Sequence, residues 1–536
     1  LYRKYTYEER HSYSLDAISN MELGEMKTPY EGTLDALYNS DFRTFIEYNR
    51  QDVMLIARLD EKLKFLDLAN VLAHANTVLL QTTMGAVAVT EQAIINETHK
   101  RGMVVPNRPY REPHSTGAAV GAYVANPKKG LHDWVGSCDI NSLYPSVIRA
   151  LNMGPETIVG QIRPVITSAE INRARHAKKS FAAAWDNQFG SWEYQAVMAK
   201  EKGTELIVDW SDDTSVRMSA AQLYELIFDG NNKWMLSANG TLFTYEFEAI
   251  IPGLLKRWYA ERKEMQRKMM ESGDNEIEKE YWDKRQLVKK INLNSLYGAI
   301  LNPGCRFFDI RIGQSVTLTG RCITKHMGAK INEVISGKYD HRGESVVYGD
   351  TDSVYFTAHK TLAKEIESGQ IPWNKESVIA LYDKIADEVN TSFVGYMTKA
   401  FHCPSTRGSV IKAGRELVAS KGLFITKKRY AVLYYDVEGT RTDVAGKEGK
   451  MKAMGLDLKR SDTPVFVQDF LSDILYMVLT GKTEEEVLQA ITDFRADFKA
   501  RPGWEKGSPK RANNVTDYWE KEKKQGRANM PGHVRA

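Results

Sequence analysis

The sequence predicts an α/β fold of the α+β kind, in which long helices accompany an antiparallel sheet. Residues 346–356 read VVYGDTDSVYF, two apolar runs around a short polar turn, which is the pattern of a β-hairpin. Residues 253–299 hold two segments of helical character on either side of the turn sequence ESGDNE, which predicts a helical hairpin. A β-rich stretch, GLFITKKRYAVLYYDVEG at 422–439, adds further strands.

The remaining elements follow from apolar spacing and from turn residues. Apolar residues recur near i, i+3, i+4 and i+7 over 41–75, which predicts helices, and a second helical region follows over 76–100. Residues 103–133 are rich in proline and glycine and predict a connection. The other expected elements are a strand ending at Asp139, a helix directly after it, helices over 313–336 and 375–402, and helices again from about 462. Residues 161–250 contain no motif that assigns them.

The bulk composition is that of an ordinary globular protein. The chain has 536 residues, of which 42% are apolar and 26% charged, and its formal net charge is +4. This length predicts three or four domains, and the charge excludes an extreme polyelectrolyte. The four cysteines contain no CxxC pair, which argues against zinc and against a disulfide framework and fits a reducing cytosol. With no apolar run of 18 residues and no signal peptide, no membrane association is expected.

Carboxylates mark two places in the chain. Asp350 and Asp352 stand one residue apart in the turn of the expected hairpin, where like charges repel by about 1 kcal/mol in water and by more in a drier site. A cation, such as a divalent metal, is therefore expected nearby. Asp139 ends a strand and precedes a helix whose first N–H groups, those of Asn141, Ser142 and Leu143, could hold phosphate oxygens. The plainer alternatives are a polar hairpin turn for the pair and a helix cap for Asp139.

Basic residues gather in the helical hairpin and in the β-rich stretch. Lys290 and Asn294 are four residues apart on one helix, so their side chains share a face and can reach one ligand. The preceding helix carries ERKEMQRKM at 261–269. TKKRY at 426–430 places basic side chains beside an aromatic ring, which suits contact with a nucleic-acid backbone. For both helices the plainer alternative is a solvated basic face.

Together these features predict phosphoryl transfer onto a nucleic acid. Their order is a strand-end aspartate, a basic helical hairpin, a paired-aspartate hairpin and a basic strand. Carboxylates in such a site hold two Mg²⁺ ions about 4 Å apart, which activate the attacking oxygen and stabilise the leaving one. Lysine and arginine neutralise the charge of a triphosphate.

Three segments resemble a known family. DINSLYPSVI at 139–148, KKINLNSLYG at 289–298 and YGDTDSVYF at 348–356 resemble motifs A, B and C of the family B DNA polymerases. From about residue 41 to the end, the chain also resembles the replicative polymerases of T-even-type bacteriophages. The segments that carry this second resemblance are NMGPETIVGQ, SKGLFITKKRYAV, DVEGTR, KMKAMGLDLKRSDTPVFVQ and GSPKRANN. The resemblance implies a palm–fingers–thumb fold with a remnant of an RNase H-like exonuclease, and DNA-directed DNA polymerase activity in phage DNA replication, in the host cytoplasm.

The resemblance implies roles for individual residues. Asp139, the Ile140 carbonyl and Asp352 would hold two Mg²⁺ ions, for which Mn²⁺ can substitute, and Asp350 would support them. Tyr144 would lie under the incoming sugar and exclude a 2′-hydroxyl, although a packed core tyrosine fits the same position. The implied nucleotide-binding residues are Ser142, Leu143, Tyr144, Arg262, Lys290 and Asn294. The implied DNA-binding residues are Tyr297, Gly298, Lys428, Arg429, Tyr430 and Lys452.

Two further positions bear on the implied site. The first fingers helix of the family carries a second basic residue four positions after its arginine, where this chain has Gln266. A register shifted by one residue, using Lys263 and Arg267, could restore the lost phosphate contact. Glu416, within GREL, resembles a further acidic residue near the site.

The N-terminal part resembles the last portion of a 3′–5′ proofreading exonuclease domain. In HSYSLDAISNMELG and EYNRQDVMLIARL, Tyr48 and Asp52 match the third exonuclease motif and share one helix face. The earlier acidic motifs cannot be located before Tyr48, so the chain by itself is expected to lack proofreading. Because it begins at Leu1 and stops inside the expected thumb, we expect a fragment, or one chain of a split polymerase whose partner carries the rest of the exonuclease. No clamp-binding tail is recognised, so a sliding clamp is not expected to bind.

The expected domains follow the chain in six segments. These are the exonuclease remainder (1–64), a helical connection with part of an N-terminal domain (65–110), the first part of the palm (111–249), the fingers (250–303), the second part of the palm (304–435) and a partial thumb (436–536). Within the palm, 161–249 has no assigned role, and an insertion like that of protein-primed relatives is one alternative. The expected partners are primer-template DNA and dNTPs.

Three other interpretations compete with that of a DNA polymerase. An RNA-templated polymerase also uses an aspartate hairpin in a palm, but NSLYG, KKRY and Tyr144 argue against it. A catalytically silent DNA-binding palm that acts as a scaffold would be favoured by a substitution at Asp139 or Asp352, and both aspartates are intact. A nuclease alone is disfavoured because the first acidic motif is missing.

Overall fold

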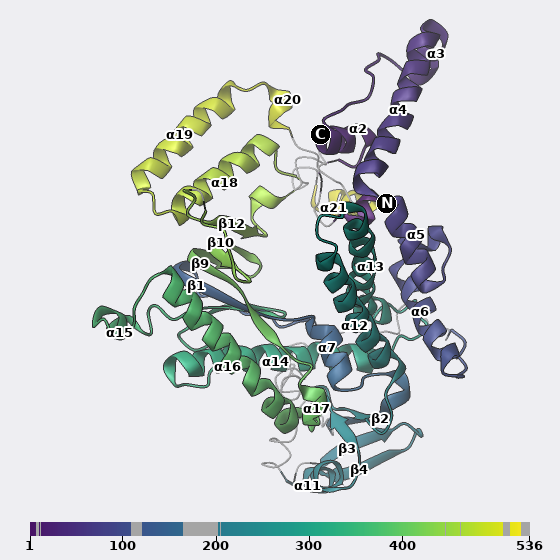
Figure 1. The fold of residues 1–536 in the computed structure, drawn as a ribbon, viewed down its shortest axis with the longest axis vertical. Coiled ribbons are helices and arrows are strands. Elements are labelled where there is room, and N and C mark those ends of the chain that lie inside the picture. Colours follow the sequence, from purple (N-terminus) through teal and green to yellow (C-terminus); the bar gives the residue numbers. More distant parts are fainter. Residues whose placement is uncertain are drawn as a thin grey trace. The chain divides into compact units, whose positions relative to one another are not determined.

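In the computed structural model the chain forms two compact units. Figure 1 labels the helices and strands of both. The residues it describes are 1–6, 10, 12–108, 121–164, 202–203, 205–444, 446–460, 462–507 and 515–526. The central unit comprises Leu66–Lys427 and Tyr434–Lys450, and the terminal unit comprises Leu1–Phe65, Lys428–Leu433 and Met451–Ala536. Parts of the expected connection (109–120), of the unassigned stretch (165–201) and of GSPKRANN lie outside the described residues. Every helix within those ranges is too short or too polar to span a bilayer.

The main sheet has the strand order β11-β10-β9-β1-β8-β7, and β12 pairs with β10. Its strands are β1 (Gly130–Ile140), β7 (Val346–Asp350), β8 (Ser353–Thr357), β9 (Ala413–Thr426), β10 (Arg429–Val437), β11 (Thr440–Arg441) and β12 (Lys450–Met454). β1 runs antiparallel to β8 and β9, and β7 runs antiparallel to β8. The predicted antiparallel sheet, hairpin and β-rich stretch are therefore confirmed. The strand expected to end at Asp139 extends one residue further, to Ile140.

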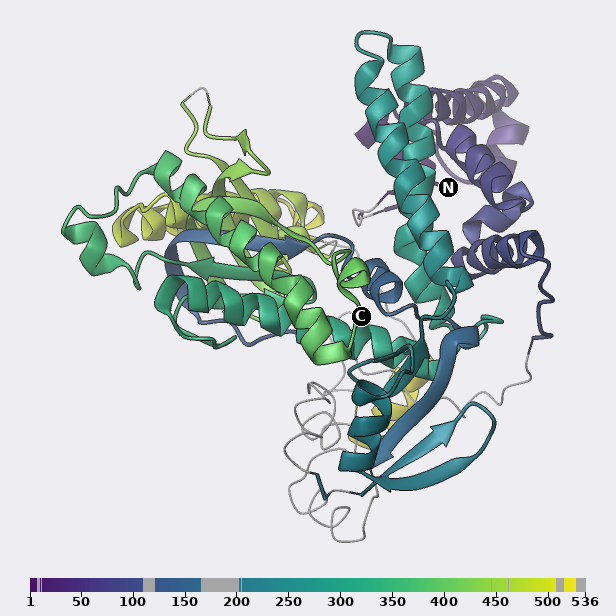
Figure 2. The same ribbon diagram turned by 60° about the horizontal axis from the view of Figure 1, so that its bottom comes forward.

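Two long helices, α14 (Ile310–Ser336) and α16 (Lys375–Phe401), cover one face of this sheet (Figures 1 and 2). α14 packs against β7 and β8, and α16 packs against β1 and β9. Gly136 on β1 allows the close approach, because a Cβ at this position would collide with the ring of Tyr382 on α16. The Tyr382 hydroxyl donates a hydrogen bond to the Trp134 carbonyl oxygen at 2.5 Å, which ties the helix to the strand that carries Asp139. Both helices were predicted.

The expected helical hairpin consists of α12 (Ile250–Glu271) and α13 (Glu276–Ile300), shown side by side in Figure 2. The Asn275 side chain caps α13 by accepting a hydrogen bond from the Glu278 N–H, as short polar residues do at helix starts. The predicted N-terminal helices α5 (Phe65–Asn76) and α6 (Ala86–Lys100) lie beside this hairpin, and α6 packs against both of its helices. The short helix α7 (Leu143–Ala150) contacts α12, α13 and α14. It therefore lies where the hairpin meets the helices that cover the sheet.

A second, smaller antiparallel sheet was not predicted. It has the order β4-β3-β2-β6-β5 and the strands β2 (Ile158–Pro164), β3 (Glu205–Trp210), β4 (Ser215–Ser219), β5 (Trp234–Leu236) and β6 (Thr241–Thr244). With α11 (Ala220–Tyr224) and η3 (Glu225–Asp229) it forms a separate apolar core that includes Val208, Leu223 and Leu242. The other short elements of the central unit are η1 (Leu80–Met84), η2 (Pro155–Thr157), α15 (Ala363–Glu367) and α17 (Ser405–Gly408).

The terminal unit is largely helical where the structure describes it. Its N-terminal helices are α1 (Tyr2–Tyr5), α2 (Leu15–Leu23), α3 (Leu34–Ser40) and α4 (Phe42–Leu63), and α4 is the principal helix expected over 41–75. Its C-terminal elements are η4 (Asp457–Lys459), α18 (Val465–Leu479), α19 (Glu484–Ala500), α20 (Gly503–Lys506) and α21 (Val515–Gln525). The return of helices after about 462 is therefore confirmed.

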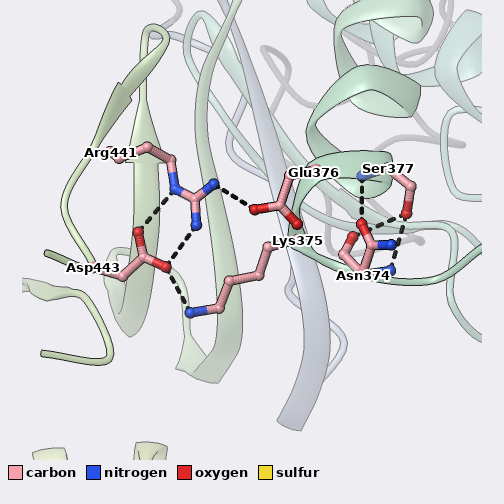
Figure 3. A network of polar contacts seen from close by, with 6 residues as sticks. All are labelled: Asn374, Lys375, Glu376, Ser377, Arg441 and Asp443. Atoms are coloured by element: carbon pink, nitrogen blue, oxygen red, sulfur yellow. Dashed lines mark hydrogen bonds and ion pairs between the residues drawn. The ribbon is translucent and has the colours of Figure 1, made fainter. Parts of the chain in front are cut away.

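A network of ion pairs closes the β11 edge of the main sheet (Figure 3). Arg441 donates two parallel hydrogen bonds to Asp443, each at 2.8 Å, and Lys375 at the start of α16 binds the same carboxylate at 2.7 Å. Arg441 also binds Glu376 at 2.8 Å. The hydrogen bonds from Arg441 and then from Lys375 hold the pKa of Asp443 far below its ordinary value. This network joins α16 to an edge strand that is only two residues long.

A buried histidine on α14 predicts how the stability of the chain depends on pH. His326 bonds the Tyr339 hydroxyl at 2.7 Å and the Ser392 hydroxyl at 2.9 Å, and burial, with a smaller effect from Lys330, lowers its pKa to about 4. Because the folded pKa lies below the unfolded one, this group costs up to about 3 kcal/mol of stability as the pH falls from 6.5 to 4. We expect His326→Gln to flatten the decline of the unfolding midpoint over that range. The matched control, His99→Gln at an exposed position, should leave the decline unchanged; equal slopes in all three proteins would contradict the prediction.

Candidate active site

The register of β1 against β8 brings Asp139 and Asp352 together. Asp139 lies opposite Ser353, and the Ile140 N–H donates a hydrogen bond to the Asp352 carbonyl oxygen at 2.9 Å. Opposed residues in antiparallel strands have Cα atoms about 5 Å apart, so the two aspartates are close neighbours although they are far apart in the sequence. Both are half-buried. The hairpin therefore presents Asp352 at the point where β1 ends.

Asp350 is held in place by hydroxyl groups. The Tyr348 hydroxyl donates to its Oδ2 atom and the Thr351 hydroxyl to its Oδ1 atom, each at 3.0 Å. Thr351 has a φ of 58°, in the left-handed region that a non-glycine residue seldom adopts, and its carbonyl oxygen accepts a 2.6 Å hydrogen bond from Thr324 on α14. The turn of the hairpin is thus tied to α14. With both carboxylate oxygens engaged by hydroxyl groups, Asp350 is suited to support the site from behind the turn.

The start of α7 offers two backbone N–H groups beside the aspartates. Ser142 is the N-cap residue, with a φ of 48°, so Asp139 does not fill the capping position that the plainer alternative gave it. The Asn141 N–H donates to the Lys412 carbonyl oxygen at 2.9 Å and is not available to a ligand in this structure. Of the three N–H groups expected to face a phosphate, those of Ser142 and Leu143 remain, at a helix start where N–H groups lack intrahelical acceptors.

The rings of Tyr144 and Tyr297 pack against each other where α7 meets α13. Their ring centroids are 4.4 Å apart, and the planes are tilted by 46°. Burial raises the pKa of Tyr144 to about 12, and the negative charges of Asp352 and Asp350 add to that rise. α14 confines the ring from another side, because a Cβ on Gly320 would come within 3.3 Å of it. Tyr144 is therefore a rigid, neutral ring close to the aspartates.

One face of α13 carries a ladder of polar side chains. Gln286, Lys290 and Asn294 are spaced by four residues, and the Arg262 Nε atom on α12 donates to the Gln286 Oε1 atom at 3.3 Å. Lys290 and Asn294 therefore lie on the α13 face that Arg262 meets. The sequence analysis did not select Gln286, although its i, i+4 spacing from Lys290 could have pointed to it.

Most other cations of this hairpin are already paired with acids. Ion pairs join Lys256 to Glu248, Arg257 to Glu97, Arg267 to Glu264 and Glu271, Lys279 to Glu276, Lys284 to Asp67, and Lys289 to Glu261. Within the part of the chain that the structure describes, Arg262 and Lys290 have no acidic partner. The same holds for Lys263 and Arg285, but these lie over the rings of Tyr259 and Tyr281. The half-buried positive charges of Arg262 and Lys290, without a counter-ion, favour an anionic ligand. Arg267, the proposed substitute for a basic residue at Gln266, is engaged by two glutamates.

Glu416 lies on β9 at a bulge beside β1. The register changes between Ser137, which faces Leu417, and Cys138, which faces Arg415, so Glu416 is the extra residue. Bulges redirect side chains and occur next to active sites. The Ser137 hydroxyl donates to the Glu416 Oε2 atom at 2.8 Å, two residues before Asp139 on the same strand. The structure thus places Glu416 next to the strand that carries Asp139.

The remaining candidate residues lie elsewhere. Gly298 follows Tyr297 on α13 and is exposed. In the terminal unit, Arg429 binds Asp457 and the Gly455 carbonyl oxygen, each at 3.1 Å, Tyr430 is buried, and Lys428 has a φ of 59°. Lys452 lies on β12. These four residues belong to the terminal unit, whereas the aspartates belong to the central unit.

A lysine that the sequence analysis missed joins the two exonuclease-like residues of the terminal unit. Lys27 donates to the Asp52 Oδ2 atom at 2.7 Å and to the Tyr48 hydroxyl at 3.0 Å. The hydrogen bonds to Asp52 and then to Tyr48 raise the pKa of Lys27. Tyr48 and Asp52 therefore share one site, as their spacing predicts. No local pattern marked Lys27, which lies on a segment before α3.

The donor atoms at the end of β1 fit a hard divalent cation. The described residues contain no group of three or more His, Cys, Asp or Glu side chains that could hold a metal ion. A metal shell at Asp139 and Asp352 would therefore be completed by carbonyl, water or phosphate oxygens, which Mg²⁺ commonly accepts. Asp352 and Asp350 both act to raise the pKa of Tyr144, and the nearby Arg321 opposes them. This all-oxygen donor set suits Mg²⁺ or Mn²⁺.

Comparison with known proteins places the chain in a family. A model described as DNA polymerase family B matches residues 77–502. The chain belongs to DNA polymerase family B. The matched range includes the aspartates of the site, α7 and the whole α12–α13 hairpin, whereas Tyr48 and Asp52 lie before it.

Several curated DNA polymerases align with most of this chain. It is 28% identical over 494 residues to the DNA-directed DNA polymerase of Escherichia phage RB69. The alignment covers 89% of this chain and 53% of the relative. The chain is 25% identical over 537 residues to that of Enterobacteria phage T4, with 97% and 58% covered. DNA polymerase II of Escherichia coli K12 is 23% identical over 544 residues, with 98% and 53% covered. The chain spans about half the length of the curated relatives it matches.

Proposed function

We propose that this chain is a DNA-directed DNA polymerase that adds deoxynucleotides to a primer 3′-hydroxyl under the direction of a template. The observation that carries the proposal is the register of β1 and β8, which sets Asp139 beside Asp352. The charges of Arg262 and Lys290, which have no acidic partner among the described residues, and the packed tyrosine rings on α7 and α13 support it. The phage relatives support a role in phage DNA replication in the host cytoplasm.

The aspartates are the residues that would hold two Mg²⁺ ions. Asp139 and Asp352 would contribute carboxylates and Ile140 its carbonyl oxygen, while Asp350 keeps the hairpin turn in place. Bound Mg²⁺, or Mn²⁺ in its stead, would lower the pKa of the primer hydroxyl and offset the charge that develops on the leaving pyrophosphate.

The α12–α13 hairpin would bind the triphosphate. Lys290 and Arg262 supply the positive charge, and Asn294 supplies an amide donor one turn further along the same face of α13. The N–H groups of Ser142 and Leu143 supply neutral donors at the start of α7. The phosphates would thus be held between α7 and the hairpin, two elements that contact each other.

Tyr144 would select deoxyribose, which gives a testable specificity. Its ring is confined by Tyr297 and by α14, so it cannot move aside for a 2′-hydroxyl. We expect Tyr144→Ala to lower the preference for dNTP over rNTP by about 10²-fold. The reason is that the smaller side chain no longer clashes with the 2′-hydroxyl of an rNTP. Ratios of kcat/KM for dATP and ATP measure this preference. Tyr144→Phe, which keeps the ring, is the control; a preference unchanged in both variants would mean that Tyr144 is only a core residue.

Several groups would bind the primer-template. Tyr297 and Gly298 would lie against the new base pair, and Lys428, Arg429, Tyr430 and Lys452 would contact the duplex. The central unit also has a cavity of about 250 Å³ beside β7, with Lys128, Arg342 and Lys427 among its lining residues. Arg342 and Lys427 suit a nucleic-acid phosphate, whereas the Lys128 Nζ atom already donates to the Gly343 and Glu344 carbonyl oxygens at 2.6 and 2.8 Å.

The terminal unit would carry residues of a proofreading site. Tyr48 and Asp52, bridged by Lys27, form one part of an exonuclease centre. We propose that Tyr48 and Asp52 contribute to a 3′–5′ exonuclease site. No clamp interaction is proposed for the described residues.

Primer extension by the purified chain tests the proposal. A labelled DNA primer on a DNA template is incubated with Mg²⁺ and one dNTP at a time, and Asp139→Asn is the inactive control. Incorporation that follows the template base and disappears in the control supports the proposal. Binding of the duplex without incorporation by the wild-type chain contradicts it and favours the DNA-binding scaffold.

A further inference from the structure

A pair of buried asparagines joins α5 to the helix that carries Lys290 and Asn294. Asn76, at the end of α5, is 1% exposed, and Asn292, on α13, is 4% exposed. The Asn292 Nδ2 atom donates to the Asn76 Oδ1 atom at 3.0 Å, and a longer 3.5 Å contact returns from the Asn76 Nδ2 atom to the Asn292 Oδ1 atom. The two amides thus hydrogen-bond to each other at a buried contact between the helices.

The pair is anchored by a third helix. The Asn96 Nδ2 atom on α6 donates to the Asn76 carbonyl oxygen at 3.1 Å and to the Thr77 hydroxyl at 2.6 Å. Gln92, one turn earlier on α6, donates to the Asn96 Oδ1 atom at 2.9 Å. The Asn76 Nδ2 atom also donates to the Leu72 carbonyl oxygen at 2.9 Å. The Asn76 side chain is therefore fixed before it meets α13.

A buried amide pair of this kind fixes the register of one helix against another, at a cost in stability. The neighbouring positions on the same stripe of α13, Val288 and Leu296, are fully buried and apolar, and they would tolerate a slide or a rotation. A buried amide does not tolerate such a movement. If α13 shifted by one residue against α5, Asn292 would turn by about 100°, and two buried polar groups would lose their partners. A single asparagine at a buried helix–helix position fixes register in this way in coiled coils.

The position of Asn292 links this alignment to the nucleotide site. It lies between Lys290 and Asn294 in the sequence and points away from their face, because two residues correspond to about 200° around a helix. A second contact between the same helices, the ion pair of Lys284 with Asp67 at 3.1 Å, lies two turns earlier. The back of α13 is therefore held at two heights while its front carries Lys290 and Asn294.

We propose that the Asn76–Asn292 pair is a positioning device that fixes the register of α13 against α5 and thereby places Lys290 and Asn294 for the triphosphate. This inference rests on the proposed polymerase function. The pair acts through the helix and does not touch the nucleotide. It follows that loss of the pair weakens nucleotide binding even when stability is kept.

Three leucine variants separate positioning from stability. Asn76→Leu and Asn292→Leu each leave one buried amide without a partner and should lower the unfolding midpoint by about 2–4 °C. The double variant removes both amides at similar shape, so its midpoint should return close to that of the wild type. All three should raise the KM for dNTP by about tenfold, less than the ~10²-fold that a 1 Å displacement can cost, with a smaller change in kcat.

A matched control is Val288→Ala, one turn before Asn292 on the same buried stripe. It should lower the midpoint through a cavity without changing the KM. Nucleotide affinity is measured in parallel from the rise of the midpoint with added dATP and MgCl₂, which requires no turnover.

The outcomes are distinct. A raised KM and a weakened dATP effect in the stable double variant support the proposal. A KM that recovers together with the midpoint, or that rises equally in Val288→Ala, overturns it. If the wild-type chain does not extend a primer but dATP still stabilises it, the affinity series alone decides. If it neither extends a primer nor responds to dATP, the proposed function fails and this inference fails with it.

Discussion

Replacement of Asp352 by asparagine is expected to lower the rate of nucleotide addition by at least about 10³-fold, which corresponds to about 4 kcal/mol of lost transition-state stabilisation. Asp352 stands at the end of the hairpin beside Asp139, so an amide at this position removes one of the two negative charges that would hold Mg²⁺. Asparagine has nearly the shape of aspartate, and the backbone bond from Ile140 to residue 352 does not involve the side chain. The fold and the binding of duplex DNA should therefore survive.

Single-turnover primer extension, with duplex affinity measured on the same preparations, checks this expectation. Asp387→Asn is the matched control, because Asp387 is an exposed aspartate on α16, remote in sequence from the motifs of the site. Partial recovery of Asp352→Asn when Mn²⁺ replaces Mg²⁺ would agree with a ligand role, since Mn²⁺ binds more tightly to the donors that remain. A rate within tenfold of the wild type would show that Asp352 is a hairpin-turn residue and would remove the main support for the proposed chemistry.

The elements that the sequence predicted well are those whose pattern is local. The period of the apolar residues over 253–299 and the two runs around Asp350 and Asp352 each specify an element without reference to the rest of the chain. The small sheet formed by β2 to β6 escaped prediction because its strands are short, and β2 pairs with β3 and β6 across long stretches of sequence. Local periodicity carries no information about such partners.

The candidate site divides in the same way. Lys290 and Asn294 could be grouped from spacing alone, whereas the meeting of Asp139 with Asp352 depends on strand order, which here was suggested by resemblance to a family. Asn292 carried a usable signal, since an asparagine interrupts an otherwise apolar stripe on α13, but its partner Asn76 is visible only once the helices are packed. Three-dimensional packing therefore adds the residues that position the site.

Removal of the Lys290 side chain is the second large expectation. We expect Lys290→Ala to raise the KM for dNTP by about 10²-fold, since a charge-assisted hydrogen bond to an anion contributes about 1.5–3 kcal/mol. The physical reason is that Lys290 has no acidic partner among the described residues, so its charge is available to a phosphate. Steady-state primer extension with a single dNTP measures this effect. Lys290→Arg should recover part of the affinity, because it restores the charge with a different geometry.

Lys279→Ala, on the same helix, is the matched control for Lys290→Ala. Lys279 is exposed and already paired with Glu276, so Lys279→Ala removes the same charge from α13 but not from the site, and the KM should change by less than about twofold. If net charge alone attracted the nucleotide, both variants would raise the KM to a similar extent and added salt would abolish both effects. A large, salt-resistant effect confined to residue 290 would instead require direct contact with the triphosphate. If both variants change the KM equally and only slightly, the plainer interpretation holds, in which Lys290 belongs to a solvated helix face.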